Sequence, residues 1–176
     1  MTYLQIAPKS RTEIPEYADI EREIGAAAGR INGAYGEADW TPIRYVNRAH
    51  SRSTLAGLYR AARVGLVTPL RDGMNLVAKE YVASQNPDDP GVLILSRFAG
   101  AAHECKAALL VNPYDPDSVA VAIGQALSMP LDERRERHNS LFKVLSQNDI
   151  QRWAGRYLSE LERKPTALSR IEQIPI

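Results

Sequence analysis

The 176-residue sequence predicts an α/β fold, in which a Rossmann-like parallel sheet carries helices on both faces. Short apolar segments alternate with segments whose apolar residues recur every three or four positions, as in strands that alternate with helices. The segment Val92-Leu93-Ile94-Leu95 is apolar at every position instead of every second one. Such a strand is typical of a parallel sheet that is covered on both faces. We therefore assign residues 1–146 to one Rossmann-like domain.

The N-terminal half supplies the first three predicted strands, which are Tyr3–Ala7, Ile43–Val46 and Val64–Thr68. Each is a short apolar run, and the second follows a Trp-Thr-Pro turn. Helices Ile14–Ile31 and Ser51–Ala62 lie between them, because their apolar residues fall on one helical face. Strand and helix thus alternate from the start of the chain.

The alternation continues through the middle of the chain. A Pro-Leu break precedes the predicted helix Met74–Ser84, and the proline-rich turn 86–91 follows it. The next strands are Val92–Ser96 and Ala108–Val111, with a short helix near Ala101–Cys105 between them. Short connections of this kind are typical of βαβ units.

The last third of the sequence is helical. Asp115 followed by Pro116 is a strong helix start, because the carboxylate caps free amides and proline fits the first turn. Helix Ser118–Met129 ends at Pro130, and a second helix occupies Leu131–Ser146.

Residues 147–163 form a further predicted helix with an apolar stripe of Trp153, Tyr157 and Leu161. The stripe is interpreted as a packing surface, and exposed aromatic residues are expected there if no partner covers it. Residues 164–176 contain two prolines and little periodicity, which predicts a loosely ordered tail.

Composition excludes several classes of protein. The net charge of +1 gives no bulk attraction to nucleic acid or to anionic membranes. No apolar run reaches the roughly 18 residues of a membrane helix, and the N-terminus is too polar for a signal peptide. The single cysteine, Cys105, rules out an intramolecular disulfide and a cysteine-rich metal site. We expect a cytoplasmic protein that requires no metal or other cofactor.

The segment Arg71–Tyr81 is the most informative in the chain, because an acid and a glycine stand between a strand and a helix. Free amides of Met74–Leu76 would hold phosphate at the helix start, while Asp72 would accept hydroxyls of a sugar. Gly73 would let a ligand approach the backbone. The alternative is that Asp72 is a helix N-cap and Gly73 a turn residue. Spacing alone leaves both interpretations open.

Three other residues are candidates on weaker grounds. Glu80 lies on the helical face that continues the loop, where a carboxylate suits a ribose diol, but a solvated Lys79–Glu80 pair is the alternative. Arg11 follows the first strand and suits a phosphate, but taken alone an arginine at the surface of a loop is the simpler interpretation. His50 follows the second strand and is either a base contact or a structural residue.

Two further motifs follow the fourth strand. The small residues of Phe98–Ala102 suit either a close approach to a sugar or tight packing. His103-Glu104-Cys105 contains metal-binding residue types, but three adjacent residues diverge around a helix, so a zinc site is rejected. Cys105 is interpreted as a small core residue.

Taken together, five ordered segments closely resemble the trehalose-6-phosphate synthase family. These segments are Leu4–Arg11, Gly29–Gly33, Gly65–Tyr81, Phe98–Ala102 and Val111–Asp115. The resemblance runs from about Tyr3 to Leu161 and implies the C-terminal, donor-binding half of a GT-B glycosyltransferase. It implies transfer of glucose from UDP-glucose to glucose 6-phosphate with retention, as a step of trehalose biosynthesis.

The resemblance also assigns roles to residues. Asp72 would contact the donor glucose, the Gly73–Leu76 backbone the sugar and phosphates, and Arg11 the acceptor phosphate. His50 would meet uracil through its backbone, and Glu80 would bind the ribose. The complete expected donor set is His50, Gly73, Met74, Asn75, Leu76, Val77, Ala78, Lys79 and Glu80.

Two features of the family lie outside the region of resemblance. In relatives, an acceptor domain and an arginine–lysine pair that neutralises the diphosphate precede the first strand. Without that cationic clamp we expect weak donor binding and little turnover. The missing half would come from a partner chain, and the helix at 147–163 would cross to it. The alternatives are a homo-oligomer and a non-catalytic, nucleotide-sugar-binding regulatory subunit.

Overall fold

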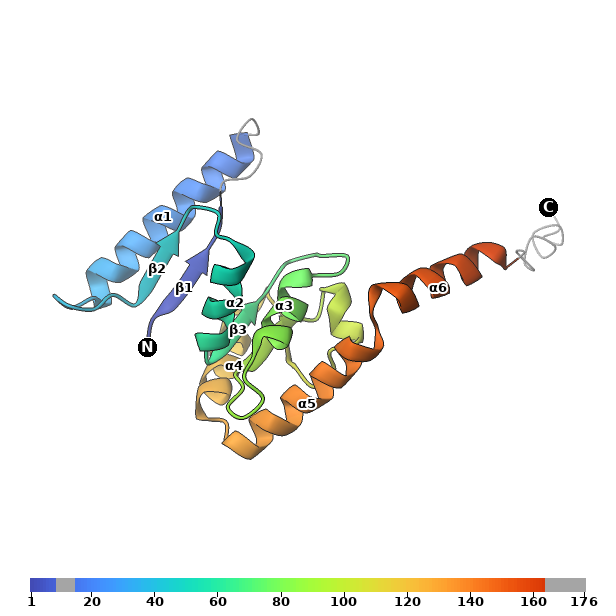
Figure 1. Cartoon of the computed structure of the whole chain (residues 1–176). Coiled ribbons are helices and arrows are strands. Elements are labelled where there is room, and N and C mark those ends of the chain that lie inside the picture. The colour runs from blue at the N-terminus through green and yellow to red at the C-terminus, as the bar shows by residue number, and fades with distance from the viewer. Residues whose placement is uncertain (9–14, 164–176) are drawn as a thin grey trace, which may run out of the picture. The chain divides into compact units, whose positions relative to one another are not determined.

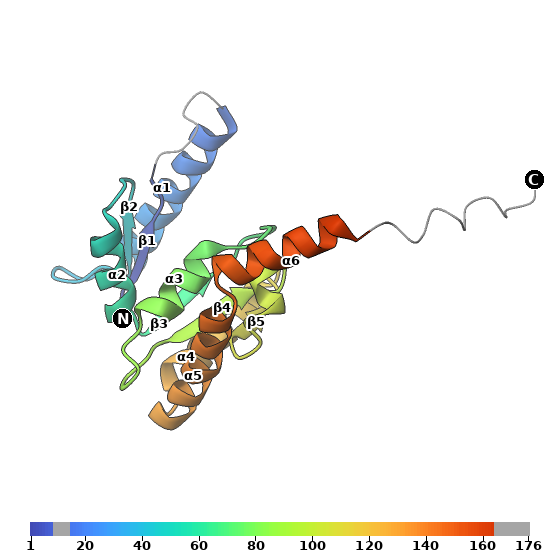
Figure 2. The same cartoon turned by 45° about the vertical axis from the view of Figure 1, so that its right-hand side comes forward.

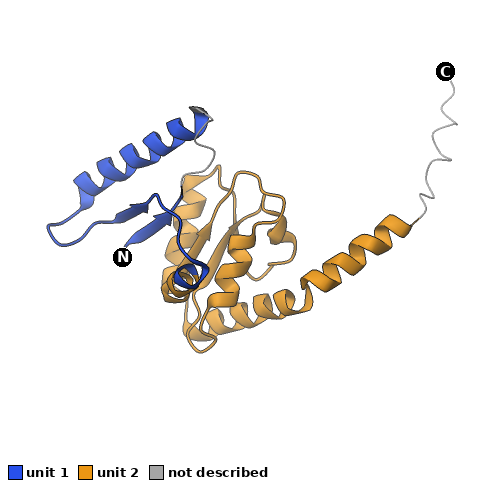
Figure 3. Ribbon diagram, turned by 45° about the horizontal axis from the view of Figure 1, so that its top comes forward, with its two compact units in different colours: residues 1–55 blue, residues 56–176 orange. Residues whose placement is uncertain are grey.

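The computed structural model describes residues 1–8 and 15–163 (Figure 1). These residues belong to two compact units, unit 1 (residues 1–55) and unit 2 (residues 56–176), with the boundary inside helix α2 (Arg52–Ala61) (Figure 3). Arg11 and the tail 164–176 lie outside the described residues. None of the described helices is both long and apolar enough to cross a membrane.

Unit 1 consists of strand β1 (Tyr3–Ile6), helix α1 (Pro15–Tyr35), strand β2 (Ile43–Val46) and the start of α2. The two strands pair in parallel, with Tyr3 opposite Ile43. The Asn32 side chain of α1 accepts from the Ile43 amide and donates to the Ile43 carbonyl, both at 2.9 Å. This pair of hydrogen bonds fixes α1 to the first residue of β2.

Unit 2 contains a parallel sheet in the order β3 (Val64–Val67), β4 (Val92–Ser96) and β5 (Leu109–Val111) (Figure 2). The α/β class and the parallel pairing are therefore confirmed. The described strands pair in two sheets, one in each unit.

Helices cover both faces of the sheet in unit 2, as the apolar run of β4 predicts. All five residues of β4 are buried. Its Leu93 and Leu95 pack with α3 (Leu76–Ser84) and α5 (Leu131–Gln147), whereas Ile94 packs with α4 (Pro116–Ser128) on the other face. Buried aliphatic contacts on two faces stabilise the strand through the hydrophobic effect.

The predicted helix start at Asp115 and Pro116 is confirmed, whereas the last helix begins at Ile150 and not at residue 147, because α5 extends through Gln147. The Asp115 carboxylate accepts from the Ser118 amide at 3.0 Å, and Pro116 stands at the first position of α4. Helix α6 (Ile150–Glu162) begins in the same way, with Asp149 accepting from the Arg152 amide at 2.8 Å.

Helix α6 has no buried residue and continues beyond α5 in Figures 1 and 2. The rings of Trp153 and Tyr157 stack at a centroid distance of 5.4 Å, and both side chains are exposed. Leu161 is exposed as well. The stripe is therefore largely exposed in the described part of unit 2, as expected for an uncovered apolar face.

Three arginines hold the turn between α3 and β4. The Asp89 carboxylate accepts from Arg63 at 2.9 Å and from the buried Arg134 of α5 at 2.6 Å. Arg134 also donates to the Pro90 carbonyl, and Arg135 donates to the Asp88 carbonyl at 2.9 Å. Hydrogen bonds from Arg63 and Arg134 hold the pKa of Asp89 at about 2, below its ordinary value of 3.8.

This low pKa predicts a stability loss in acid. A carboxyl with a depressed folded pKa stabilises the fold above its unfolded pKa, so its contribution is lost as the pH falls from about 4 to about 2. We expect Asp89→Asn to flatten this part of the stability curve, as measured by urea unfolding at several pH values. Asp88→Asn, next to it on the turn, is the matched control and is expected to keep the slope. An unchanged slope in Asp89→Asn would contradict the assignment.

Candidate functional site

The loop between β3 and α3 is organised by Asp72 and Asn75. One Asp72 carboxylate oxygen accepts from the Met74 amide at 3.0 Å, and the other accepts from the Asn75 side chain at 3.1 Å. Asn75 is the N-cap of α3, and its side-chain oxygen accepts from the Ala78 amide at 2.9 Å. The N-cap interpretation of Asp72 is therefore wrong, and α3 begins at Leu76 instead of Met74.

Asn75 is the only described non-glycine residue with a positive φ, at 73°. Asparagine tolerates this left-handed conformation better than most residues, because its short polar side chain bonds locally. In this conformation the side-chain nitrogen of Asn75 donates to the Asp72 carboxylate, and its side-chain oxygen accepts from the Ala78 amide of α3. Asn75 thus fixes the Asp72 carboxylate relative to the helix start.

The first turn of α3 keeps unused amides. No described residue accepts a hydrogen bond from the backbone N–H of Leu76 or Val77. The side chains of both residues are exposed, at 60% and 44%. Free amides at a helix N-terminus attract anions, because the helix dipole adds positive potential there.

Helix α3 has one buried face and one exposed face. Tyr81, Val82 and the fully buried Ala78 join the core under the sheet, whereas Glu80 lies on the exposed side with Leu76. Since the Ala78 amide already bonds Asn75, Ala78 offers no free polar group to a ligand.

Lys79 pairs with a residue of the next connection and not with its neighbour. Its ammonium lies 2.9 Å from the carboxylate of Glu104, and both side chains are partly buried. The solvated Lys79–Glu80 pair considered from the sequence is therefore wrong. Lys79 links α3 to the segment that follows the 3-10 helix η1 (Gly100–His103).

The Glu80 carboxylate faces helix α2. Burial raises the pKa of the Tyr59 phenol, and the negative charge of Glu80 raises it further. The Ser84 hydroxyl donates to the backbone carbonyl of Glu80 at 2.7 Å, but no described side chain forms a hydrogen bond or ion pair with the Glu80 carboxylate. Its carboxylate oxygens are therefore available to hydroxyl donors from a ligand.

A second loop, Arg97–Ala101 after β4, lies against the Asp72 loop. Its Gly100 amide donates to the Asp72 carbonyl at 2.9 Å, and its Ala101 amide donates to the Met74 carbonyl at 2.7 Å. In return the Asp72 amide donates to the Phe98 carbonyl at 3.3 Å. The small residues of this segment thus serve loop-to-loop packing, one of the two roles left open by the sequence.

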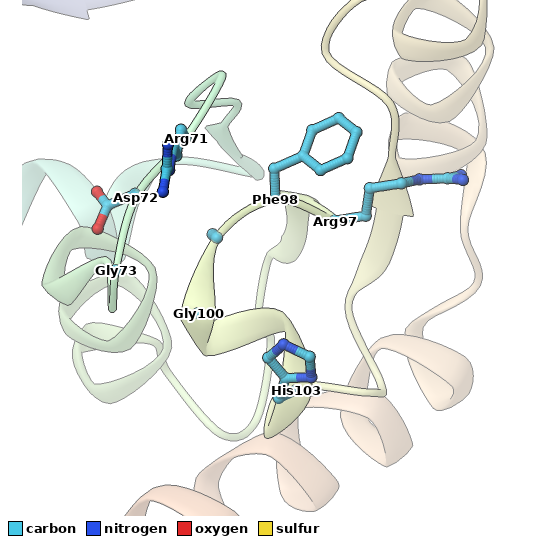
Figure 4. A pocket seen from close by; sticks show the side chains of 8 residues that line it. Arg71, Asp72, Gly73, Arg97, Phe98, Gly100 and His103 are labelled. Atoms are coloured by element: carbon cyan, nitrogen blue, oxygen red, sulfur yellow. The ribbon is translucent and has the colours of Figure 1, made fainter. Parts of the chain in front are cut away.

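A shallow pocket of about 250 Å³ lies between the two loops (Figure 4). It is lined by Arg71, Asp72, Gly73, Arg97, Phe98, Ala99, Gly100 and His103. The Arg97 side chain runs away from Asp72 in Figure 4. Sequence reasoning did not assign Arg71, Arg97 and His103 to the site. The signal that would have found them is their place in the two connections that follow neighbouring parallel strands.

The metal-like segment His103-Glu104-Cys105 diverges as expected. Cys105 is fully buried, Glu104 pairs with Lys79, and His103 lines the pocket. Burial raises the pKa of the Cys105 thiol. Among the described residues, no group of three or more His, Cys, Asp or Glu side chains is placed to hold a metal ion.

The structure brings Asp72 and residues 73–80 together in unit 2, and it places His50 in unit 1. His50 is half-buried in the loop between β2 and α2. Arg11 lies outside the described residues, so its expected role at the acceptor phosphate stays a prediction.

Comparison with known proteins agrees with this arrangement of strands and loops. The family model described as glycosyltransferase family 20 matches residues 1–163. The chain belongs to glycosyltransferase family 20. A trehalose-6-phosphate synthase from Sinorhizobium fredii is 60% identical over 161 residues, which are 92% of this chain and 35% of that protein.

Solved structures place the fold in the same family. An alpha,alpha-trehalose-phosphate synthase (UDP-forming) from Burkholderia xenovorans, in complex with glucose-6-phosphate, superposes with a TM-score of 0.89 at 51% identity. The match covers 92% of this chain and 36% of that one. A structure described as trehalose-6-phosphate from E. coli, bound with UDP-2-fluoro glucose, has a TM-score of 0.89 at 53% identity and covers 93% of this chain and 36% of that one.

This family 20 chain spans about a third of the length of the relatives it matches. The α/β architecture of these structural neighbours, which are GT-B glycosyltransferases, agrees with the parallel strands and helices of both units. Family membership therefore rests on sequence and fold together.

Proposed function

We propose that this chain is the donor-binding part of a retaining glycosyltransferase that transfers glucose from UDP-glucose to glucose 6-phosphate, forming trehalose 6-phosphate. The observation that carries the proposal is the pair of unused amides at Leu76 and Val77, directly after the organised Asp72 carboxylate. Amides that can donate to an anion and a carboxylate that can accept from hydroxyl groups thus belong to one short segment of the chain. A nucleoside-diphosphate sugar needs both.

The carboxylate of Asp72 is suited to sugar hydroxyls. Each of its two oxygens accepts one hydrogen bond from the loop, and each oxygen retains a second lone pair. The two loop bonds fix the carboxylate before a ligand arrives, which lowers the entropy cost of binding. We assign Asp72 to the donor glucose.

The start of α3 is suited to the diphosphate. As the bond between glucose C1 and the diphosphate oxygen breaks, negative charge grows on the leaving UDP. The free amides of Leu76 and Val77, together with the helix dipole, stabilise that charge. Glu80, one turn further, accepts from the ribose hydroxyls. Ala78 stabilises the helix by packing in the core, and Lys79 stabilises it through the ion pair with Glu104.

Two ligands of related proteins support this choice of substrates. The Burkholderia xenovorans relative is described in complex with glucose-6-phosphate, and the E. coli structure is bound with UDP-2-fluoro glucose. We propose that the same two substrate classes serve this chain, with Arg11 at the acceptor phosphate and the His50 backbone at the base.

We also propose that the 176-residue chain turns over little by itself, because it spans about a third of its relatives. A domain that orients the acceptor contributes proximity, and its loss removes a large part of the rate enhancement. The exposed stripe of Trp153, Tyr157 and Leu161 on α6 is the surface we assign to contact with that domain. Appreciable trehalose 6-phosphate formation by the purified chain would contradict this proposal.

The donor site is tested by calorimetry with UDP and with UDP-glucose. Removing a carboxylate that accepts two ribose hydroxyls costs about 1.5 to 3 kcal/mol, which corresponds to roughly a 10- to 100-fold loss of affinity. We therefore expect Glu80→Ala to weaken both ligands to this extent. Glu136→Ala, an exposed helical glutamate of α5, is the matched control and is expected to bind as the unmodified chain does. Equal affinities in the two variants would remove Glu80 from the ribose role.

A further inference from the structure

The Asp72 loop has no regular secondary structure of its own, and the second loop holds its backbone. Asp72 and Ala99 form an isolated parallel bridge beyond the ends of β3 and β4. The hydrogen bonds from Asp72 to Phe98, from Gly100 to Asp72 and from Ala101 to Met74 fix three consecutive contacts along the two loops. Both the backbone amide and the backbone carbonyl of Asp72 are therefore hydrogen-bonded to the second loop.

The second loop is itself anchored in the core. The fully buried Ser96, the last residue of β4, accepts from the Phe98 amide through its hydroxyl at 3.1 Å and from the Ala99 amide through its carbonyl at 3.1 Å. Ala99 and Ala101 are almost completely buried, at 1% and 2% exposure. A loop anchored by buried, hydrogen-bonded residues holds the loop that lies on it in a fixed position.

Gly100 is the point of closest approach between the two loops. A Cβ atom at this position would overlap the Gly73 carbonyl oxygen and would lie 2.7 Å from the Gly73 carbonyl carbon and 3.2 Å from the Met74 Cα. These are backbone atoms, which cannot rotate away as a flexible side chain would. Any side chain at position 100 must push the Gly73–Met74 backbone outward.

We propose that Gly100 is a positioning residue for the glucose of the donor, acting through Asp72. Because Gly100 has no side chain, the second loop approaches closely and fixes the position of the backbone of residues 72–74. The Met74 amide and the Asn75 side chain then fix the position of the Asp72 carboxylate through hydrogen bonds. Gly100 lines the pocket with backbone atoms only, and the direction of its missing Cβ faces the Gly73 carbonyl. The inference rests on the proposed function, because it assumes that Asp72 receives the donor glucose.

The test compares UDP with UDP-glucose in the full 176-residue chain. The change in the ratio of the two dissociation constants between variants reports the contribution of the glucose, because the charge difference between UDP and UDP-glucose is the same in every variant. Partial unfolding lowers both affinities by the same factor. A displaced Asp72 carboxylate loses its charge-assisted hydrogen bonds to the glucose hydroxyls, which costs on the order of 10- to 100-fold in affinity. We expect Gly100→Ala to reduce the glucose contribution by about tenfold or more, to the level of Asp72→Ala.

A double variant tests whether Gly100 affects donor binding through Asp72 or independently of it. If Gly100 acts through Asp72, adding Gly100→Ala to Asp72→Ala changes the ratio no further, because the two changes remove one interaction. Gly124→Ala in α4 is the control, since a Cβ there meets no atom within 4 Å. We expect it to leave the ratio unchanged. An additive loss in the double variant, or an unchanged ratio in Gly100→Ala, would overturn the proposal.

A milder variant tests the same role if Gly100→Ala does not fold. Ser96→Ala removes only the hydroxyl that accepts from the Phe98 amide, so it loosens the second loop without a steric overlap. We expect a smaller fall in the same ratio, and an unchanged ratio would overturn the positioning role. Failure of the proposed function looks different. In that case the unmodified chain would bind neither UDP nor UDP-glucose, or Asp72→Ala would leave the ratio of the two dissociation constants unchanged.

Discussion

Replacement of Tyr81 by alanine is expected to lower the free energy of unfolding of unit 2 by about 3 to 5 kcal/mol. Tyr81 is 2% exposed at the centre of the core between α3 and the sheet, and its hydroxyl donates to the Ala62 carbonyl at 3.0 Å. Its truncation leaves a large cavity and an unpaired carbonyl. Since domains of this size are stable by only about 5 to 15 kcal/mol, this loss is a large fraction of the total stability.

Urea unfolding followed by circular dichroism measures this loss. Tyr81→Phe removes only the hydroxyl and is expected to cost about 1 kcal/mol. Tyr157→Ala, the same change at an exposed helical position of α6, is the control and is expected to stay within about 0.5 kcal/mol. Equal effects of Tyr81→Ala and Tyr157→Ala would show that Tyr81 is not a core residue.

The space for Tyr81 comes from a strand glycine. A Cβ at Gly65 in β3 would lie 2.7 Å from the Tyr81 ring. Gly65→Ala therefore overpacks the core, which typically costs about 1 to 3 kcal/mol. Because all three nearest atoms belong to the Tyr81 ring, we expect this cost to nearly vanish in a Tyr81→Ala background. Additive costs in the double variant would contradict this coupling.

The fold was predictable where local pattern and burial agree. Val92–Ser96 is apolar along its length, and all five residues are buried between helices as expected. Asp115 and Pro116 marked the start of α4 because capping depends on neighbouring residues only. The division of the chain at residue 55 was not predictable, since it depends on contacts between distant segments. Alternating strands and helices have the same local pattern in one sheet or in two.

The site was predictable as a segment but not in its geometry. Spacing left Asp72 as a candidate helix cap, and the structure gives the cap to Asn75 in a left-handed conformation. Such a conformation is rare outside glycine, so periodicity does not reveal it. The ion pair of Lys79 with Glu104 and the contact of Gly100 with Gly73 join residues about 25 positions apart. Only the folded chain shows which loop meets which.

Gly73→Ala is expected to remove most of the donor affinity while leaving the fold intact. The Gly73 φ lies outside the left-handed region, and a Cβ there meets no protein atom within 4 Å. The fold itself therefore tolerates alanine, and the smaller entropy of the unfolded chain makes the variant as stable as the original or slightly more stable. The added methyl group stands at the pocket between the two loops, where the donor glucose is proposed to lie.

The contrast with Gly100 makes this variant informative. At Gly100 a side chain collides with backbone, so the protein requires the glycine, whereas at Gly73 the surrounding atoms leave room. A binding loss at Gly73 therefore reports a ligand that approaches the backbone. We expect roughly a 10- to 100-fold increase in the dissociation constant of UDP-glucose, because a sugar displaced by the methyl group loses its charge-assisted hydrogen bonds to Asp72. Thermal unfolding of the same variant shows whether the fold is unchanged. Undiminished binding by a stable Gly73→Ala chain would place the donor sugar elsewhere.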